Sequence, residues 1–301
     1  MSTKTPVTVG RRKLELSNLD KVFYPKTGTT KGDVIDYYRA VAPVLLPHLK
    51  DRFLTLKRYP NGVEDKFFYE KECPKHRPDW VKTAPMVRKK DNKAVNYCLL
   101  NDEPSLVWSA NLANLELHTS LARATNFYRP TVLVFDLDPG EPAGILECVE
   151  VGLMIKKIFD KDGLEVVPKT SGSKGLQLFV PLNTAVTYDD TKPLAHELAK
   201  KLEQDHPDLI VSGQSRAERT GKVLVDWSQN DDHKTTASVY SLRAKERPTA
   251  STPVTWTEAR KALKAGTPEA LVFTKDDLLA RIDKHGDLFE PVLKLKQKLP
   301  R

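Results

Sequence analysis

Long apolar runs are missing from this sequence, and its first residues, MSTKTPVTVGRRKLELS, are polar and basic. A membrane-spanning helix needs about 20 consecutive, mostly apolar residues. A secretory signal peptide needs an apolar centre behind its basic residues. The sequence therefore predicts neither, and we expect a cytoplasmic protein that is not attached to a membrane.

Cysteine is scarce: Cys73, Cys98 and Cys148 are the three in 301 residues. They are odd in number and widely spaced, which predicts neither a disulfide framework nor a CxxC metal site. We expect all three to be small, buried or half-buried side chains in a reducing compartment.

Negative charge is in deficit, since 48 Lys and Arg face 40 Asp and Glu and the net charge is +8. The basic residues are spread along the chain, which indicates a basic face on a folded body. Such a surplus favours a polyanionic partner, nucleic acid before an anionic membrane, although solubility alone would also account for it.

Apolar periodicity predicts an α/β (α+β) fold, with central mixed β-sheets flanked by helices. The chain shows no internal repeat and no low-complexity segment, and no Pro/Gly/Ser-rich linker lies between 100 and 245. We expect a single domain over 1–301, with an N-terminal part to about 100, a catalytic core over about 104–245 and C-terminal helices over about 250–301. Pro43 should kink or end the regular part of the first helix. The expected helices cover 30–49, 104–115, 143–161, 190–205, 257–264 and 275–285, and the expected strands cover 131–137, 164–168, 176–181, 222–227 and 237–242.

Two aspartates close the apolar run TVLVFDLDPG. Side chains at i and i+2 of a strand share a face, so Asp136 and Asp138 should point the same way. Adjacent carboxylates repel unless a cation lies between them, and Mg²⁺ and Mn²⁺ prefer such ligands. A polar strand end would look the same. A phosphatase of the DxDxT kind is disfavoured because Gly140 stands where the threonine would be.

The run KVLVDWSQN delivers a third carboxylate, Asp226, at the end of another apolar strand. Three such aspartates can hold two metal ions about 3.5–4 Å apart, the arrangement used for in-line phosphoryl transfer. The loop TSGSKG, from Thr170 to Gly175, taken alone is best explained as an ordinary Gly/Ser turn. Beside the three aspartates, a cradle for a triphosphate becomes the better interpretation.

Basic and aromatic residues alternate in the N-terminal third, as in KRYPNGV and FFYEKE. Alternation should send one of Phe67 and Phe68 outward, where it could stack on an unpaired base. Packing of both rings in the core is the alternative.

These segments stand in one order: NLDKVFYPKTGTTKGDVIDYY, KRYPNGV, FFYEK, LELHT, LVFDLDPG, TSGSKGL, KVLVDWSQN and YSLR. Together they closely resemble the polymerase domain of bacterial ligase D, of the archaeo-eukaryotic primase superfamily, over about residues 10–290. The resemblance implies a primase-polymerase of non-homologous end joining that fills gaps and extends broken DNA ends with NTPs or dNTPs, prefers ribonucleotides and favours Mn²⁺ over Mg²⁺. It also implies a nucleoid-associated location.

The resemblance also implies roles for single residues. Two metal ions would be held by the catalytic Asp136, Asp138 and Asp226. The incoming nucleotide would be contacted by Lys57, His118, Ser171, Ser173, Lys174, Gln177, Gln229 and Arg243. A downstream 5′-phosphate would be bound by Lys21 and Lys31, and the template and DNA groove by Phe67, Phe68 and Arg219.

The sequence departs from the family pattern at Gln177, where SGSKGLH has a histidine. Glutamine forms hydrogen bonds but carries no proton charge near neutral pH, so the rate or metal preference could differ. No ligase or nuclease segment follows, so we expect a stand-alone enzyme or part of a longer protein, with a separate ATP-dependent ligase and the end-binding protein Ku as partners. The alternatives are a non-catalytic module that binds DNA ends and 5′-phosphates, and a primase that starts chains without a primer.

Overall fold

A computed structural model describes residues 4–87 and 93–300 and divides the chain into two units. Unit 1 comprises Met1–Thr125, Thr235–Ala250 and Thr274–Gly286. Unit 2 comprises Asn126–Lys234, Ser251–Phe273 and Asp287–Arg301. No helix in the described residues is long and apolar enough to cross a membrane.

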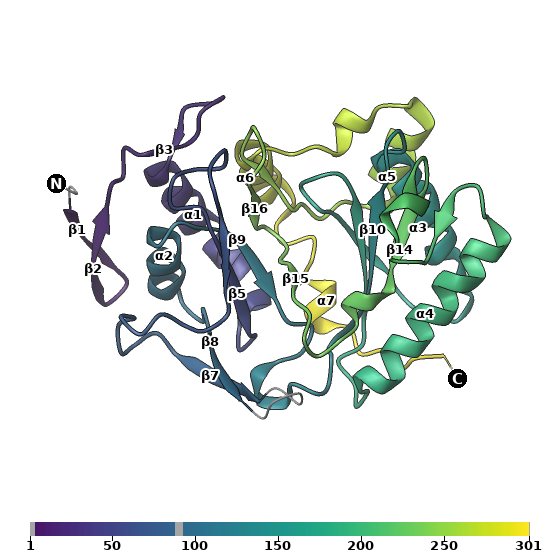
Figure 1. The fold of residues 1–301 in the computed structure, drawn as a ribbon, viewed down its shortest axis with the longest axis horizontal. Coiled ribbons are helices and arrows are strands. Elements are labelled where there is room, and N and C mark those ends of the chain that lie inside the picture. Colours follow the sequence, from purple (N-terminus) through teal and green to yellow (C-terminus); the bar gives the residue numbers. More distant parts are fainter. Residues whose placement is uncertain (1–3, 88–92, 301) are drawn as a thin grey trace. The chain divides into compact units, whose positions relative to one another are not determined.

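Unit 1 is built on a six-stranded sheet in the order β15-β9-β5-β8-β7, with β6 paired to β5 (Figure 1). Its strands are β5 (Leu54–Arg58), β6 (Phe68–Glu70), β7 (Thr83–Val87), β8 (Ala94–Cys98), β9 (Asn114–Thr119) and β15 (Thr236–Ala237). Two-stranded ladders are formed by β1 (Lys4–Val9) with β2 (Arg12–Ser17), β3 (Val22–Tyr24) with β4 (Thr29–Thr30), and β16 (Leu242–Arg243) with β17 (Thr249–Ala250).

Helix α1 (Lys31–Leu49) begins where local chemistry favours a helix start. The hydroxyl of Thr30 accepts from the backbone N–H of Asp33, and the Asp33 carboxylate accepts from the N–H of Thr30 in return. This capping box satisfies backbone donors that the first turn leaves open. The buried face repeats at helical spacing through Val34, Tyr37, Tyr38, Val41 and Leu45. The other helices of unit 1 are α2 (Glu103–Asn111) and α6 (Lys275–His285).

Unit 2 contains a five-stranded sheet in the order β11-β12-β10-β14-β13. Its strands are β10 (Val132–Pro139), β11 (Val167–Thr170), β12 (Leu176–Pro181), β13 (Ile210–Val211) and β14 (Val223–Asp226). The central strand β10 is antiparallel to both of its neighbours, while β13 and β14 are parallel. The helices are α3 (Ile145–Lys161), α4 (Tyr188–Asp205), α5 (Trp256–Ala265) and α7 (Pro291–Lys294).

Alternation along β10 separates the core of unit 2 from a polar face. Leu133, Phe135 and Leu137 are fully buried in a hydrophobic cluster to which α3, α4 and α5 also contribute. Asp136, between Phe135 and Leu137, and Asp138, directly after Leu137, are only partly buried. Burial of the apolar residues thus fixes which face of the strand carries the carboxylates.

Two glycines let other backbone segments approach the end of β10. A Cβ on Gly175 would lie 2.0 Å from the carbonyl oxygen of Leu137, and one on Gly140 would lie 1.9 Å from that of Arg219. No side chain fits at either position. The TSGSKG loop and the segment before β14 are therefore held against the strand end that carries the aspartates.

The mixed α/β fold class is confirmed, with differences in several elements. The helix expected over 104–115 ends at Asn111, and the chain then turns into β9. Helix α1 continues past Pro43 to Leu49. The strand expected over 237–242 is split into β15 and β16, because Tyr240 between them adopts a φ of 64°, outside the β region.

The cysteine expectation is wrong for two of the three residues. Cys73 and Cys98, 25 positions apart, form a disulfide. Cys73 follows β6, its N–H donates to the carbonyl of Asn96, and Cys98 ends β8. The sheet therefore brings together two side chains that sequence spacing did not connect. Cys148 is free and buried, as expected.

Candidate active site

The three predicted metal-binding aspartates lie on adjacent strands of unit 2. Asp136 pairs directly with Asp226 in the antiparallel register of β10 and β14, and Asp138 follows two residues later on the face of Asp136. The register thus brings Asp226 to the carboxylates that strand alternation had already placed together.

Burial and neighbouring carboxylates disfavour the ionised form of Asp136 in this cluster. Burial raises the pKa of Asp136 to about 7, and the charges of Asp138 and Asp226 add to the effect, while a hydrogen bond from Gln177 opposes it. Asp226 is buried and engaged: Oδ1 accepts from the N–H of Ser228 at 2.9 Å and Oδ2 from Nε2 of Gln229 at 2.9 Å. A bound cation would relieve the repulsion that raises the pKa of Asp136.

Gln177 is buried and lies opposite Asp136 in the β10–β12 register. Its Oε1 accepts from Nζ of Lys169, a fully buried lysine that also donates to Oγ of Ser251 at 2.7 Å. Gln177 therefore links Lys169 to Asp136. Lys169 was not predicted as a site residue because nothing in its local sequence indicates that its charge is buried.

The TSGSKG loop connects β11 to β12 as a tight turn. The hydroxyl of Ser171 accepts from the backbone N–H groups of Ser173, at 3.2 Å, and Gly175, at 3.1 Å. Ser171 thus organises the loop from within, while Ser173 is partly exposed. The ammonium of Lys174 is exposed and forms an ion pair with Glu141.

Two other predicted residues lie near the third aspartate. Gln229 donates to Asp226, as described. Arg219 ends the short 3₁₀ helix η2 (Arg216–Arg219), and its Nη2 donates to the carbonyl of Gln214 at 2.8 Å. Gln214 in turn donates to Oδ1 of Asp226 at 3.2 Å.

In unit 1, three predicted nucleotide contacts converge on a residue that was not predicted, Glu116. Its carboxylate lies 3.1 Å from Nζ of Lys57, 2.9 Å from Nε2 of His118 and 3.3 Å from Nε of Arg243. The three basic side chains come from β5, β9 and β16. Glu116 stands two residues before His118 in β9, so the alternation that joined Asp136 to Asp138 could also have placed it beside His118.

Charge interactions hold the Glu116 cluster in a defined ionisation state. Burial alone would raise the pKa of Glu116, but the hydrogen bond from His118 and the charges of Arg243, His118 and Lys57 hold it well below its usual range. Burial lowers the pKa of His118, against the opposing effect of Glu116. Glu116 is therefore ionised at neutral pH.

Lys21 and Lys31 are also close together in unit 1. The N–H of Lys31 donates to the carbonyl of Lys21, and its Nζ donates to that of Ser17 at 2.6 Å. Burial lowers the pKa of Lys31 to about 8, with the charges of Lys21 and Arg58 adding to the effect. Such a group of cations suits a phosphate.

Phe67 and Phe68 are both exposed, at 48% and 44%, so the expectation that only one points outward is wrong. The two rings lie against consecutive residues of β5, whose side chains point to opposite faces of the sheet. Nζ of Lys57 lies 4.5 Å from the ring centroid of Phe67, whereas Phe68 lies against Arg58. Tyr69 is exposed as well, and its ring meets that of His118 edge to face.

Within the described residues, a tight group of possible metal ligands is formed by Asp231, Asp232 and His233, whose ligand atoms all lie within 4.8 Å of one another. The three predicted aspartates do not form a second group this tight in the described structure. Asp231 is already bound by Lys192, and exposed acidic groups of this kind are common without a metal.

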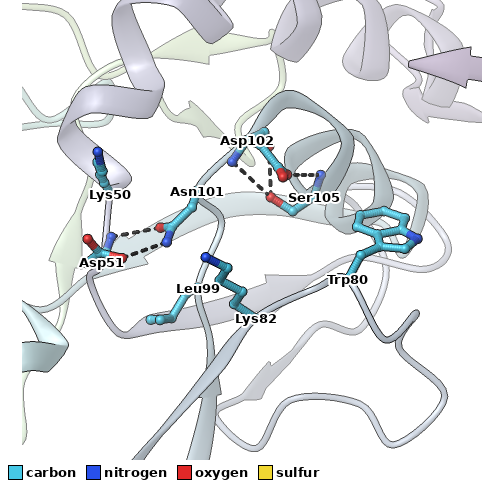
Figure 2. Close-up of a pocket in the computed structure, with 8 residues that line it drawn as sticks. All are labelled: Lys50, Asp51, Trp80, Lys82, Leu99, Asn101, Asp102 and Ser105. Atoms are coloured by element: carbon cyan, nitrogen blue, oxygen red, sulfur yellow. Dashed lines mark hydrogen bonds between the residues drawn. The ribbon is translucent and has the colours of Figure 1, made fainter. Parts of the chain in front are cut away.

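Two cavities in unit 1 hold none of the predicted site residues. One, of about 320 Å³, is lined by Lys50, Asp51, Trp80, Lys82, Leu99, Asn101, Asp102 and Ser105. Figure 2 shows that its polar groups bond to one another, Asn101 to Asp51 and Ser105 to Asp102. The other, of about 290 Å³, lies between the starts of α1 and α6.

Comparison with known proteins gives consistent matches. A family model described as the LigD primase-polymerase domain matches residues 30–289. A multifunctional non-homologous end joining protein LigD of Mycolicibacterium smegmatis is 38% identical over 282 residues, which cover 93% of this chain and 36% of that protein. A bifunctional LigD of Bacillus subtilis is 32% identical over 91% of this chain and 43% of its own length.

A solved structure, the polymerase domain of Mycobacterium tuberculosis ligase D in complex with DNA, matches with a TM-score of 0.86 and 38% identity. The match covers 94% of this chain and 99% of that one. The chain thus spans the whole of that domain, but only about two fifths or less of the full-length relatives.

Proposed function

We propose a function from one premise: the chain belongs to the LigD primase-polymerase domain family. It is a template-directed nucleotidyltransferase that fills gaps and extends broken DNA ends in non-homologous end joining. The observation that carries this proposal is the carboxylate cluster of unit 2, with Asp136 opposite Asp226 and Asp138 on the same face.

The donor set fits divalent cations. Carboxylate oxygens are the ligands that Mg²⁺ and Mn²⁺ prefer. Burial first, and then the charges of Asp138 and Asp226, raise the pKa of Asp136, and a bound cation would favour its ionised form. We assign two such ions, Mn²⁺ or Mg²⁺, to Asp136, Asp138 and Asp226. When bound, they supply the Lewis-acid charge that nucleotidyl transfer needs.

The remaining site residues act on the nucleotide. Lys57 and Arg243 in unit 1 would neutralise phosphate charge, and His118, whose pKa is lowered by burial, would contact the phosphates by hydrogen bonding. All three are held as a group by Glu116. In unit 2, Ser173 and Lys174 would contact phosphate, while Ser171 keeps the loop in shape. Gln177 and Gln229 would act through the aspartates, by hydrogen bonding to Asp136 and Asp226.

Other residues would hold the DNA. Lys21 and Lys31 suit a downstream 5′-phosphate, Phe67 and Phe68 are exposed for stacking on template bases, and Arg219 suits the DNA groove. Family membership further suggests a preference for ribonucleotides, Ku and an ATP-dependent ligase as partners, and a place at the nucleoid in the cytoplasm.

A gap-filling assay tests the proposed activity. The substrate is a gapped duplex with a 5′-phosphate, supplied with labelled NTP or dNTP and with Mn²⁺ or Mg²⁺; a primer ending in a dideoxynucleotide is the matched control. We expect incorporation that follows the template base and stops with the dideoxy primer. Binding that depends on the 5′-phosphate without incorporation under either metal would instead show a DNA-end module. Synthesis on a primer-free template would show a primase.

A further inference from the structure

The carboxylate of Glu116 is the common partner of five groups in unit 1. Oε1 accepts from Nζ of Lys57 at 3.1 Å, from the hydroxyl of Tyr59 at 3.3 Å and from the N–H of Ala244 at 3.1 Å. Oε2 lies 2.9 Å from Nε2 of His118 and 3.3 Å from Nε of Arg243. Only 2% of the residue is exposed.

Burying a carboxylate is costly unless its oxygens are bound by opposite charges and hydrogen-bond donors. Here those partners come from separate parts of the fold. Lys57 faces Glu116 across the β5–β9 ladder, His118 lies two residues further along β9, and Arg243 belongs to β16. Removing Glu116 would leave side chains from three strands without the anion that fixes their relative positions.

Aromatic rings confine the lysine of this group further. Nζ of Lys57 lies 4.5 Å from the ring centroid of Phe67, 5.3 Å from that of Tyr59 and 5.7 Å from that of Tyr69. Cations are attracted to ring faces at such distances. The ammonium group of Lys57 is therefore held in one place by Glu116 and these rings.

We propose that Glu116 is a positioning residue for nucleotide binding, acting through Lys57, His118 and Arg243. This inference rests on the proposed function, in which these three bind the phosphates of an incoming nucleotide. Glu116 does not touch the nucleotide itself. It holds the three basic groups in place before binding, so that little order has to be gained when the phosphates arrive.

The direction in which nucleotide affinity changes when Glu116 is removed distinguishes a positioning role from simple repulsion between Glu116 and the phosphates. A negative group near a triphosphate repels it, so removing that charge without disturbing the cations would strengthen nucleotide binding. If Glu116 positions the cations, its removal releases them and lets Lys57 and Arg243 repel each other. Nucleotide binding would then weaken although the local charge has become more favourable.

The test uses Glu116→Gln, which preserves size and removes charge. The dissociation constant of a fluorescent nucleoside triphosphate is measured with Mn²⁺ and no DNA, so that no turnover contributes. We expect binding at least about tenfold weaker, the loss typical of hydrogen bonds to charged groups. Glu70→Gln is the matched control: it removes a carboxylate that pairs with Arg58, the neighbour of Lys57 in β5, and should leave nucleotide binding unchanged.

Two further variants keep the test decisive. Tyr59→Phe removes only a hydroxyl that donates to Glu116 and should weaken binding a few-fold even if Glu116→Gln does not fold. In a double-mutant cycle, adding Glu116→Gln to Lys57→Met should cost much less than adding it to the wild type, because the two groups act as one. A purely structural role would instead give additive losses.

Unchanged or tighter nucleotide binding by a folded Glu116→Gln protein, or additive losses in the cycle, would overturn the inference. If Glu116→Gln does not fold, unchanged binding by Tyr59→Phe would do the same. Failure of the wild type to bind any nucleotide is a different result, since it removes the proposed function on which the inference rests.

Discussion

Lys31 shows how burial changes the chemistry of one side chain. Its ammonium is held by Ser17 inside unit 1, and burial, together with Lys21 and Arg58, lowers its pKa to about 8. In the unfolded chain, a lysine has a pKa of about 10.4. Between these values the folded chain binds fewer protons than the unfolded chain, so this residue makes folding more favourable as the pH rises through that window.

The same shift predicts a pH dependence of DNA binding. As the pH rises through about 8, Lys31 loses the charge that would attract a 5′-phosphate. The affinity advantage of a 5′-phosphorylated over an unphosphorylated gapped duplex should therefore fall between pH 7 and pH 9. Lys31→Arg, whose charge persists at both values, should keep the advantage. An equal advantage at both pH values in the wild type would contradict the assignment of Lys31.

Asn230 illustrates how a side chain completes an element. Strand β14 pairs with β10 only from Asp136 onward, so the N–H and C=O of Val134 lie beyond its reach. The buried amide of Asn230 accepts from that N–H at 2.9 Å and donates to that C=O at 2.7 Å. The strand that carries two of the aspartates is thereby held by a side chain where no strand is available.

Asn230→Ala should leave two buried backbone groups without partners. At about 1–3 kcal/mol for each such group, the free energy of unfolding should fall by roughly 2–6 kcal/mol. Thermal or urea unfolding measures the change, with the exposed Asn126→Ala as control. A loss below about 0.5 kcal/mol, as for an ordinary surface substitution, would show that water replaces the amide.

The disulfide ties the chain after β6 to the end of β8. Since the two cysteines are 25 positions apart, closure should contribute about 3.5 kcal/mol to the stability of unit 1, by restricting the unfolded chain. Reduction should lower the urea midpoint of the wild type, and Cys98→Ser should be equally low and insensitive to reductant. Identical midpoints for the oxidised and reduced wild type would contradict this contribution.

Local chemistry explains which elements could be predicted. The helix over 275–285 matches α6 because its capping residues and apolar spacing lie within the helix itself. The disulfide, and the division of the expected strand at Tyr240, depend on segments distant in sequence, so no local pattern predicts them. In the candidate site, alternation places Asp136 beside Asp138, whereas the register that brings Asp226 opposite, and the meeting of Lys57 with Arg243 at Glu116, are tertiary.

At the scale of the whole chain, the net charge of +8 predicts salt-sensitive DNA binding. Each phosphate neutralised by a lysine or arginine releases a counterion. Neutralising about four phosphates would weaken binding roughly 100-fold between about 50 and 200 mM salt. Fluorescence anisotropy with a labelled gapped duplex measures this slope. A flat response would mean that the basic residues serve solubility rather than DNA.

The central claim is that Asp136, Asp138 and Asp226 carry nucleotidyl transfer, and Asp136→Ala tests it most directly. Template-directed extension of a gapped duplex should fall by roughly 10³-fold, the scale of losing a main electrostatic element of a site. Affinity for the duplex should persist, and the unfolding midpoint should not fall, because the substitution also removes a repelled charge. Extension at the wild-type rate by a folded Asp136→Ala protein would contradict the account.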